Sequence, residues 1–329
     1  MRSNESSRPG RRPGHAAWAI GTAVLGRPAY ITTAAADVLP DDRSVESMRQ
    51  ATFDVLDAAL ASGVDWVDTA RSYGRAEEFV GDWWRDRAAA DPTWIDRAPT
   101  VSSKWGYAYV GDWDRDAAVH EIKEHSEAQF RRQWGLTEQT LPRLSVYQVH
   151  SLTTDSPLFD DPGLLDALAD LRDSGVAIGF TTTGTGQAET IRKAMDVDRK
   201  GGRLFSEVQS TWNLLEPSVG EALSLASRRE LTVLIKESLA NGRLITRPPA
   251  ALMEIAGDHG AGLDAVALAV VARQPWVDRV LLGAAGVQQL ASNLAADAVE
   301  LTDEEVGRLL ASAQDPADYW DDRSRLAWA

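Results

Sequence analysis

Residues 61–76 read ASGVDWVDTARSYGRA, and this stretch decides the fold. Its first three residues form a helix stop, because a glycine after the last helical turn readily takes the left-handed backbone that ends many helices. The run 64–68 that follows has the length and composition of a buried strand. This strand ends at Asp68, and a polar loop that contains Tyr73 comes next. The stretch therefore predicts a helix end, a strand and a loop in direct succession.

The same unit recurs along the whole chain. Short apolar runs that we predict as strands lie at 16–21, 64–68, 100–104, 144–150, 177–182, 205–209, 232–237 and 279–283. Segments with helical spacing of Leu, Val and Ala lie between them, at 44–61, 76–88, 114–134, 163–174, 187–195, 219–229, 263–273 and 287–298. Strict alternation predicts a parallel sheet with right-handed crossovers, and eight units allow the sheet to close. We therefore expect an α/β fold, a (β/α)8 TIM barrel, with an open doubly wound sheet as the alternative.

The N-terminal residues precede the first predicted strand. Residues 1–14 are expected to form a disordered lead. Arg11-Arg12 before the apolar stretch 16–25 offers an alternative, a twin-arginine export signal. Cleavage of that stretch would remove the first strand and leave seven, which would not close this barrel. The strand count therefore favours the disordered lead.

The remaining chain, residues 15–329, is expected to form a single domain because no internal repeat or low-complexity linker divides it. Residues 300–311 have the pattern of a capping helix, with Thr302 as its N-cap. A tail at 315–329 carries aromatic residues among acidic ones, and its role is left open.

Composition excludes several classes of partner and cofactor. The chain has 34 basic and 49 acidic residues, a net charge of −15, which repels nucleic acid and anionic membranes. The absence of cysteine rules out disulfides, iron–sulfur clusters and a thiol nucleophile. No apolar run reaches the ~18 residues of a membrane span. We expect a cytoplasmic protein with no nucleic acid or membrane partner, and its oligomeric state is left open.

Polar residues occur where the predicted strands end. Asp68 ends the second strand, Lys104 the third and His150 the fourth, and Tyr73 follows in the loop after Asp68. Because barrel enzymes build their sites at the carboxyl ends of the strands, these side chains are expected to meet on one rim. Each has a structural alternative as a turn, core or packing residue. A lysine among apolar neighbours needs a carboxylate beside it, however, and Asp68 on the next strand supplies one.

Reduction of a carbonyl is the chemistry that uses such a set. A hydride that reaches the carbonyl carbon leaves an alkoxide, which must take a proton. Tyr73 is the expected proton donor, with Lys104 and Asp68 expected to lower its pKa. His150 is expected to orient the carbonyl oxygen by a hydrogen bond. The chemistry requires no metal.

These residues also carry a family resemblance. The stretch 63–74 is similar to the Asp-Thr-Ala-x-x-Tyr-Gly signature of the aldo-keto reductases, and 103–106 and 147–150 resemble the lysine and histidine motifs of that family. The resemblance covers nearly the whole chain. It implies a barrel that binds NADP(H) in extended form without a Rossmann domain. It also assigns proton donation to Tyr73, with the other three residues in the roles given above.

The resemblance implies cofactor contacts on the first strand and the later strands. Thr181 stands where a serine usually holds the nicotinamide carboxamide, Gln209 is the second carboxamide partner, and Trp212 stands where a tyrosine often stacks on the nicotinamide. The loop 236–244 resembles the segment that wraps the pyrophosphate. The full set of implied contacts is Gly21, Thr22, Thr181, Gln209, Trp212, Ser238, Leu239, Gly242, Gly283, Gln289 and Asn293.

The segment 282–293 resembles the one that holds the adenosine 2′-phosphate and adenine. Many members carry Arg or Lys two residues after its glycine, where this chain has Ala285, and no cation lies between Gly283 and Asn293. Since a guanidinium is the best partner for a 2′-phosphate, this weakens the preference for NADP(H). On the resemblance, NADP(H) is still expected ahead of NAD(H).

Aromatic residues crowd the long loop after the third strand. Trp105, Tyr107 and Trp113 are expected to bind substrate at the mouth of the barrel, with packing of the loop as the alternative. His120 and His125 are five residues apart and so do not share a helical face; a solvated, charged helix is expected there rather than a zinc site.

The predicted function is that of an NAD(P)H-dependent oxidoreductase acting on an aldehyde, ketone or sugar-like carbonyl, or on the corresponding alcohol. A non-redox isomerase or dehydratase on the same barrel is one alternative. A regulatory subunit that senses the cofactor is another.

Overall fold

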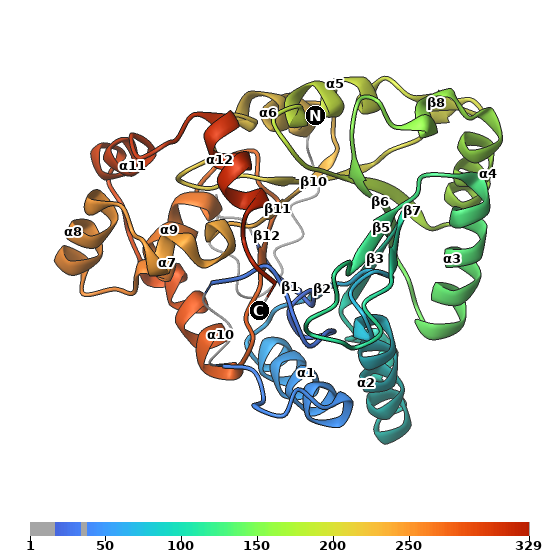
Figure 1. Ribbon diagram of the computed structural model, residues 1–329, viewed down its shortest axis with the longest axis horizontal. Coiled ribbons are helices and arrows are strands. Elements are labelled where there is room, and N and C mark those ends of the chain that lie inside the picture. Colours follow the sequence, from blue (N-terminus) through green and yellow to red (C-terminus); the bar gives the residue numbers. More distant parts are fainter. Residues whose placement is uncertain (1–16, 34–37, 329) are drawn as a thin grey trace.

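The computed structural model describes residues 17–33 and 38–328. The predicted lead at 1–14 and its export-signal alternative lie outside the described residues. Eight parallel strands close a barrel in the order β1-β12-β11-β10-β7-β6-β3-β2 (Figure 1). They are β1 Ala17–Gly21, β2 Trp66–Asp68, β3 Thr100–Trp105, β6 Val146–Leu152, β7 Ala177–Thr182, β10 Glu207–Thr211, β11 Thr232–Lys236 and β12 Arg279–Leu282. The predicted (β/α)8 TIM barrel is therefore confirmed.

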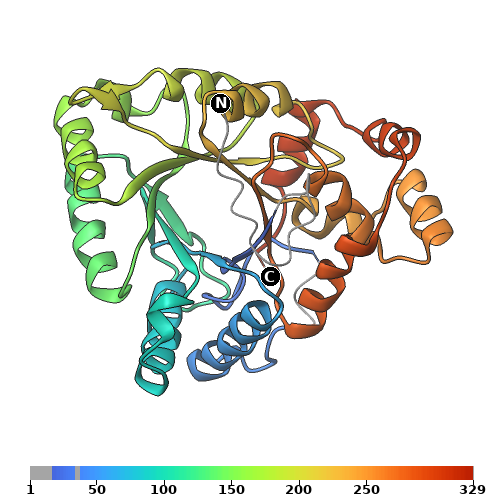
Figure 2. The same cartoon turned by 180° about the vertical axis from the view of Figure 1, so that it is seen from behind.

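Helices form the outer ring of the barrel, as the view from behind also shows (Figure 2). One follows each strand: α1 Val45–Ala61, α2 Ala76–Ala90, α3 Glu127–Thr140, α4 Pro162–Asp173, α5 Gln187–Met195, α6 Gly220–Arg228, α9 Leu263–Ala272 and α10 Val287–Leu294. Side chains cap several of them; Ser44, for example, accepts a hydrogen bond from the backbone N–H of Ser47. The main apolar core lies between the strands and this ring. A second, smaller apolar cluster includes Trp66 and Leu234.

Most of the shorter elements lie in the connections between the barrel strands and helices. Between β11 and α9 lie α7 Arg243–Thr246 and α8 Ala250–His259, and α11 Asp303–Leu310 follows the last barrel helix. Further short elements are the hairpin β8 Asp198–Arg199 and β9 Gly202–Arg203, and the 3-10 turns η1 Trp94–Asp96, η2 Pro157–Asp160, η3 Ala240–Gly242 and η4 Ala295–Ala298. Thr302 caps α11 and exchanges hydrogen bonds with Glu305, so the predicted N-cap is confirmed.

The segment 107–126 differs from the prediction. In place of the first half of the helix expected at 114–134, an antiparallel hairpin of β4 Tyr107–Tyr109 and β5 Glu121–Lys123 extends from the barrel, and α3 begins only at Glu127. Asp112 and Trp113, in the connection between the two strands, take the left-handed backbone (φ 44° and 63°), which turns the chain back toward β5. His120 and His125 are 7% and 4% exposed, so the expectation of a solvated helix was wrong.

The tail forms a twelfth helix, α12 Pro316–Ser324, which the sequence did not predict. It lies against the barrel beside β10 and β11, and the chain then runs toward β1 across the opening (Figure 1). Within the described part of the chain, no single helix has the length and hydropathy to cross a membrane; only the pair α8 and α9, bent by 97°, meets both criteria together.

Candidate active site

The centre of the site is an ion pair at the ends of two neighbouring strands. Asp68 ends β2 and Lys104 lies near the end of β3, and both side chains are almost fully buried. Lys104 Nζ contacts Asp68 Oδ2 and also donates to the carbonyl of Thr69 at 2.9 Å. A buried ammonium is stable only with such partners. The predicted pairing of these two residues is therefore present.

The other carboxylate oxygen of Asp68 is held by three donors. Oδ1 accepts hydrogen bonds from Ser102 Oγ at 2.7 Å, Gln148 Nε2 at 3.0 Å and Gln209 Nε2 at 3.3 Å. Gln209 also donates to Gln148 Oε1 at 3.2 Å. Asp68 is thus fixed on both sides, and Gln148 links it to Gln209.

Tyr73 lies above this pair in the loop after β2. Lys104 Nζ is 4.9 Å from the centre of its ring, and the ring itself is 9% exposed. Burial, followed by the negative charge of Asp68, raises the pKa of Tyr73 well above that of free tyrosine. Burial outweighs the lowering effect of the Arg27 guanidinium, and the contribution expected of Lys104 stays a prediction. Tyr73 is consequently held as a neutral phenol, the form that can donate a proton.

His150 lies beside Tyr73, with ring centres 5.6 Å apart and the rings edge to face. Ser72 Oγ lies 3.3 Å from its Nδ1, and Tyr107 packs against its ring at 5.0 Å. Burial, and after it the charge of Lys104, lowers the pKa of His150 well below its usual value. A neutral imidazole keeps one N–H, so His150 can donate to a carbonyl oxygen without losing a proton.

His125 supports His150 and was missed by the sequence reasoning. Its Nε2 donates to the carbonyl of His150 at 2.9 Å, and its Nδ1 lies 2.8 Å from Ser156 Oγ. Burial lowers the pKa of His125 to about 4, so it is neutral. Its position on the hairpin side of the barrel has no signal in the sequence, since the segment 114–134 has helical spacing.

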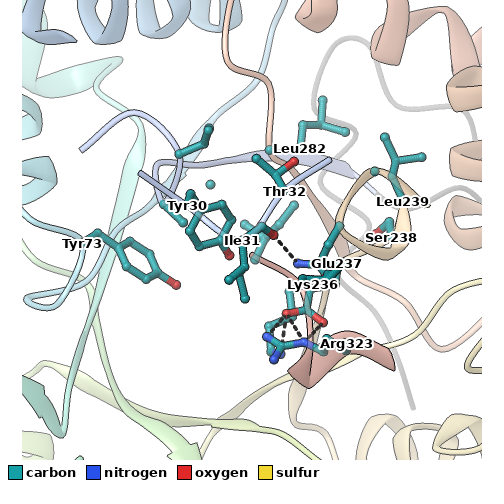
Figure 3. Close-up of a pocket in the computed structure, with 18 of the residues that line it drawn as sticks. Tyr30, Ile31, Thr32, Tyr73, Lys236, Glu237, Ser238, Leu239, Leu282 and Arg323 are labelled. Atoms are coloured by element: carbon teal, nitrogen blue, oxygen red, sulfur yellow. Dashed lines mark hydrogen bonds and ion pairs between the residues drawn. The ribbon is translucent and has the colours of Figure 1, made fainter. Parts of the chain in front are cut away.

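Asp68, Tyr73 and His150 border a cavity of roughly 660 Å³ at the open end of the barrel (Figure 3). Most of the predicted contacts line it: Gly21, Asp68, Tyr73, Tyr107, His150, Gln209, Ser238, Leu239, Gly242, Gly283, Gln289 and Asn293. Lys104 lies behind this wall, under Tyr73. Figure 3 shows Tyr73 on one side of the cavity and Ser238, Leu239 and Leu282 on the other.

Three predicted cofactor residues do not line the cavity. The hydroxyl of Thr22 donates to the carbonyl of Asp68 at 3.1 Å, and that of Thr181 accepts from the N–H of Ser151 at 2.7 Å. Trp212 packs outside the barrel, where its Nε1 donates to the carbonyl of Pro217. Successive residues of a strand point to opposite faces, and Thr211, which bonds Lys236 and Glu237, takes the inward position. The stacking role predicted for Trp212 was therefore wrong.

Two of the three predicted substrate residues also lie elsewhere. Trp105 follows the inward Lys104 and so points outward, where it packs on His125 and Phe130. Trp113 lies against Phe79 and donates to the carbonyl of Arg43. Trp105 and Trp113 therefore pack against the rest of the protein, as the alternative interpretation expected, and do not line the cavity. Tyr107, by contrast, lines the cavity.

Lys236 and Glu237 begin the predicted pyrophosphate loop, but the charged cluster that they form with Arg323 was not predicted. Glu237 accepts a bidentate contact from Arg323 of α12 and lies 3.8 Å from Lys236 Nζ. Burial lowers the pKa of Lys236 to about 8, although Glu237 opposes the shift. Burial alone would raise the pKa of Glu237. The charges of Arg323 and Lys236 outweigh burial and hold this pKa well below the usual range. All three side chains line the cavity.

Arg27 forms the mouth of the cavity with aromatic rings around it. Its guanidinium lies 4.7 Å from the ring centre of Tyr30, 5.1 Å from that of Tyr73 and 4.8 Å from that of Trp328. Glu121 on β5 accepts a hydrogen bond from Arg27 Nη1 at 2.8 Å. The tail and the hairpin thus complete the wall of the cavity that the barrel leaves open.

The loop after β11 turns tightly beside the cavity. Glu237, Ala240, Asn241 and Gly242 all have positive φ, and the amides of Ala240 and Gly242 donate to the carbonyls of Glu237 and Leu239 within the loop. Ser238 lines the cavity, and its hydroxyl is buried without a hydrogen-bond partner in the described part of the chain. A buried hydroxyl normally has a partner. These residues fit the pyrophosphate of a dinucleotide, with Gln209 available for a carboxamide beside Tyr73.

A model of the aldo/keto reductase family matches residues 40–313. The Bacillus subtilis (strain 168) protein named uncharacterized oxidoreductase YqkF is 24% identical over 293 residues, 81% of this chain and 89% of that protein. The aldo-keto reductase ausK of Aspergillus calidoustus is 23% identical over 293 residues, 77% of this chain and 70% of that protein.

The fold has solved counterparts. The structure of the glycerol dehydrogenase AKR11B4 from Gluconobacter oxydans superposes with a TM-score of 0.65 at 21% identity, covering 92% of this chain and 94% of that one. This likeness bears on the fold alone. Together with the family match over most of the chain, the barrel and its strand-end residues lead to one conclusion: the chain belongs to the aldo/keto reductase family of oxidoreductases.

Proposed function

We propose that this protein transfers a hydride between a nicotinamide dinucleotide and a small carbonyl or alcohol, with Tyr73 as the general acid and base. One observation carries the proposal: Tyr73 lines the cavity with its ring centre 4.9 Å from the ammonium of Lys104, which is paired with Asp68. Such a tyrosine can give up its proton only to a strong base, and the alkoxide formed by carbonyl reduction is one.

When bound, the cofactor supplies the hydride in reduction and takes it up in oxidation. His150 donates a hydrogen bond to the carbonyl oxygen and so fixes its position. As negative charge develops on that oxygen, the hydroxyl of Tyr73 transfers its proton to it. Lys104, 4.9 Å from the ring centre, stabilises the phenolate that remains. In oxidation the phenolate takes the alcohol proton back.

The walls of the cavity indicate the kind of substrate. Tyr30, Tyr107 and Trp328 offer aromatic faces, while Arg27 and Glu121 offer polar groups. Aromatic faces beside hydrogen-bonding groups suit a polar carbonyl such as a sugar or a ring-bearing aldehyde better than a bulky lipid. A neutral substrate is favoured, because each of these two charged groups already has a partner.

The proposal is tested by titrating the full-length protein with NADH and NADPH while following its tryptophan fluorescence. Turnover on a panel of aldehydes, ketones and sugars is then measured with the nucleotide that binds. We expect saturable binding and oxidation of the reduced nucleotide with at least one carbonyl. Failure of both nucleotides to bind would overturn the proposed function. Binding without turnover on any carbonyl would point instead to a regulatory role.

A further inference from the structure

The cavity continues beyond the catalytic residues to a second chemical environment. Past the loop at 238–242, residues of α9 and α10 and the residue after β12 line the cavity. They are Leu263, Asp264 and Leu268 of α9, Gln289, Ser292 and Asn293 of α10, and Gly283. If the reactive ring of a dinucleotide lies at Tyr73 and its pyrophosphate at Ser238, its adenosine must reach this region. The inference that follows therefore rests on the proposed function.

This end of the cavity has a fixed carboxylate. Asp264 lies in the first turn of α9, where the helix dipole favours a negative charge. Its Oδ2 accepts a hydrogen bond from Asn293 Nδ2 at 2.8 Å. Its Oδ1 lies so close to Gly262 that a Cβ there would approach it to 2.5 Å. Asp264 is thus held in the wall by its hydrogen bond from Asn293 of α10.

Cations are absent from this end among the residues that the structure describes. The lysine and arginine side chains that line the cavity are Arg27, Lys236 and Arg323. Arg27 covers the ring of Tyr73, and Arg323 binds Glu237 next to Lys236. Lys236 and Arg323 lie beside the loop at 238–242 (Figure 3), and none of the three cations belongs to α9 or α10.

The position where a cation would be expected, Ala285, offers no group to a phosphate. The backbone N–H of Ala285 donates to Gln289 Oε1 at 2.9 Å, so this amide is already used within the chain. The side chain of Ala285 is 1% exposed and does not line the cavity. A 2′-phosphate, which carries about two negative charges, would find a carboxylate there and no guanidinium to offset it.

We propose that Asp264 determines the cofactor preference of this protein and selects NAD(H) over NADP(H). The 2′-hydroxyl of NAD(H) can donate a hydrogen bond to a carboxylate, as in other folds where an acidic residue meets the adenosine ribose. The 2′-phosphate of NADP(H) can only be repelled by it. The order of preference is the reverse of the one that the family resemblance implies.

The test is a comparison of dissociation constants from fluorescence titration, in the absence of any carbonyl substrate. Wild type is expected to bind NADH about 10- to 100-fold more tightly than NADPH, the range expected for one unscreened like-charge contact. Asp264→Asn should reduce that ratio about tenfold or more, chiefly by tightening NADPH. Asp258→Asn, on an exposed position of α8, removes the same charge and should leave the ratio unchanged.

A second variant tests the same point without altering Asp264. Ser292 lies exposed on α10 and also lines the cavity, so Ser292→Arg brings in a cation at little cost to packing. It should tighten NADPH much more than NADH. If wild type binds NADPH as tightly as NADH, or if neither Asp264→Asn nor Ser292→Arg changes the ratio, the inference is wrong while the proposed function stands. If neither nucleotide binds, both are wrong.

Discussion

Arg323 of α12 and Glu237 at the end of β11 form a bidentate ion pair 86 residues apart in the chain. Their side chains are 21% and 8% exposed, and Glu237 also faces Lys236 across 3.8 Å. This pair fastens the C-terminal helix to the wall of the cavity. The residues after α12 then cross the mouth of the cavity, and the ring of Trp328 stacks on that of His120.

Breaking this pair should loosen the tail. We expect Arg323→Gln to lower the free energy of unfolding by about 3 kcal/mol, because it leaves the Glu237 carboxylate partly buried without its main partner. The Michaelis constant for the carbonyl should also rise, since the tail forms part of the wall. Urea denaturation and steady-state kinetics measure the two effects.

Arg325→Gln is the matched control. Arg325 pairs with Asp321 on the same helix, but their side chains are 70% and 55% exposed, and exposed pairs contribute little. Equal stability of the two variants would show that the tail is not held by Arg323.

Removal of the Tyr73 hydroxyl should separate binding from chemistry. We expect Tyr73→Phe to bind the dinucleotide as wild type does and to lose carbonyl reduction by a factor of about 100 to 10,000, the usual contribution of a general acid. Stopped-flow or steady-state oxidation of the reduced nucleotide gives the rate, and fluorescence titration gives the affinity. Tyr109→Phe is the control, because Tyr109 lies on the hairpin and does not line the cavity. Full activity in Tyr73→Phe would exclude it as the proton donor.

The grouping of the four proposed catalytic residues was predictable because chemistry and topology agree on it. A parallel barrel brings the ends of β2, β3 and β6 to one rim, and a buried lysine requires a carboxylate close by. Asp68, Lys104 and His150 therefore follow from their positions in the strands. Their mutual support through Ser102 and Gln148 becomes visible only when the inward faces of the strands meet.

Two aromatic residues were misplaced although the sequence held the signal. Trp105 directly follows Lys104, and Trp212 directly follows Thr211, so in each pair only one member can face the inside of the barrel. Once Lys104 and Thr211 are assigned inward, the tryptophans must pack under the helices. Because side chains alternate between the two faces of a strand, neither Trp105 nor Trp212 could take the role predicted for it inside the barrel.

The tail had no such signal. The pairing of Arg323 with Glu237 and the stacking of Trp328 on His120 are long-range contacts, and nothing local distinguishes Arg323 from the neighbouring Arg325. The hairpin at 107–123 was equally hidden, because its left-handed residues, Asp112 and Trp113, are not glycines.

The pH dependence should reflect Lys236 and not His150. His150 has a pKa well below 6.5 and is neutral throughout the neutral range, so kcat/KM should show no ionisation near pH 6.5. Lys236 has a pKa of about 8 and loses its charge above that pH. The affinity for the anionic dinucleotide should therefore fall above pH 8 in wild type. It should not fall in Lys236→Met, and Lys200→Met, at the surface, should behave as wild type.

The same residue should make stability depend on pH in a defined direction. The pKa of Lys236 is lowered in the folded state, from 10.5 to about 8. Below pH 8 the lysine is charged in both states, and the full cost of burying that charge is present. Between pH 8 and 10.5 the folded state releases the proton first, so that cost is relieved and stability rises. Wild type should gain stability relative to Lys236→Met over this window in urea denaturation; a loss would contradict the assignment.

Gly26 and the Tyr73 loop fit together too closely for any side chain. A Cβ on Gly26 would lie 2.2 Å from the carbonyl oxygen of Tyr73 and 2.3 Å from the Cβ of Ala76, and the carbonyl of Gly26 accepts from the N–H of Arg75 at 2.7 Å. Gly26→Ala must therefore push the Tyr73 loop away from β1. We expect a loss of about 1–3 kcal/mol of stability, as for other overpacked sites.

The effect on catalysis should be larger than the effect on the fold. A shift of Tyr73 by about 1 Å can lower the rate about 100-fold, because proton transfer depends on distance and direction. Gly135→Ala is the control: a Cβ at this position of α3 would have nothing within 4 Å of it, and alanine there should raise stability by about 0.5–1 kcal/mol. Activity, nucleotide affinity and urea denaturation are measured on both variants. Wild-type turnover in Gly26→Ala would show that the position of Tyr73 does not depend on this contact.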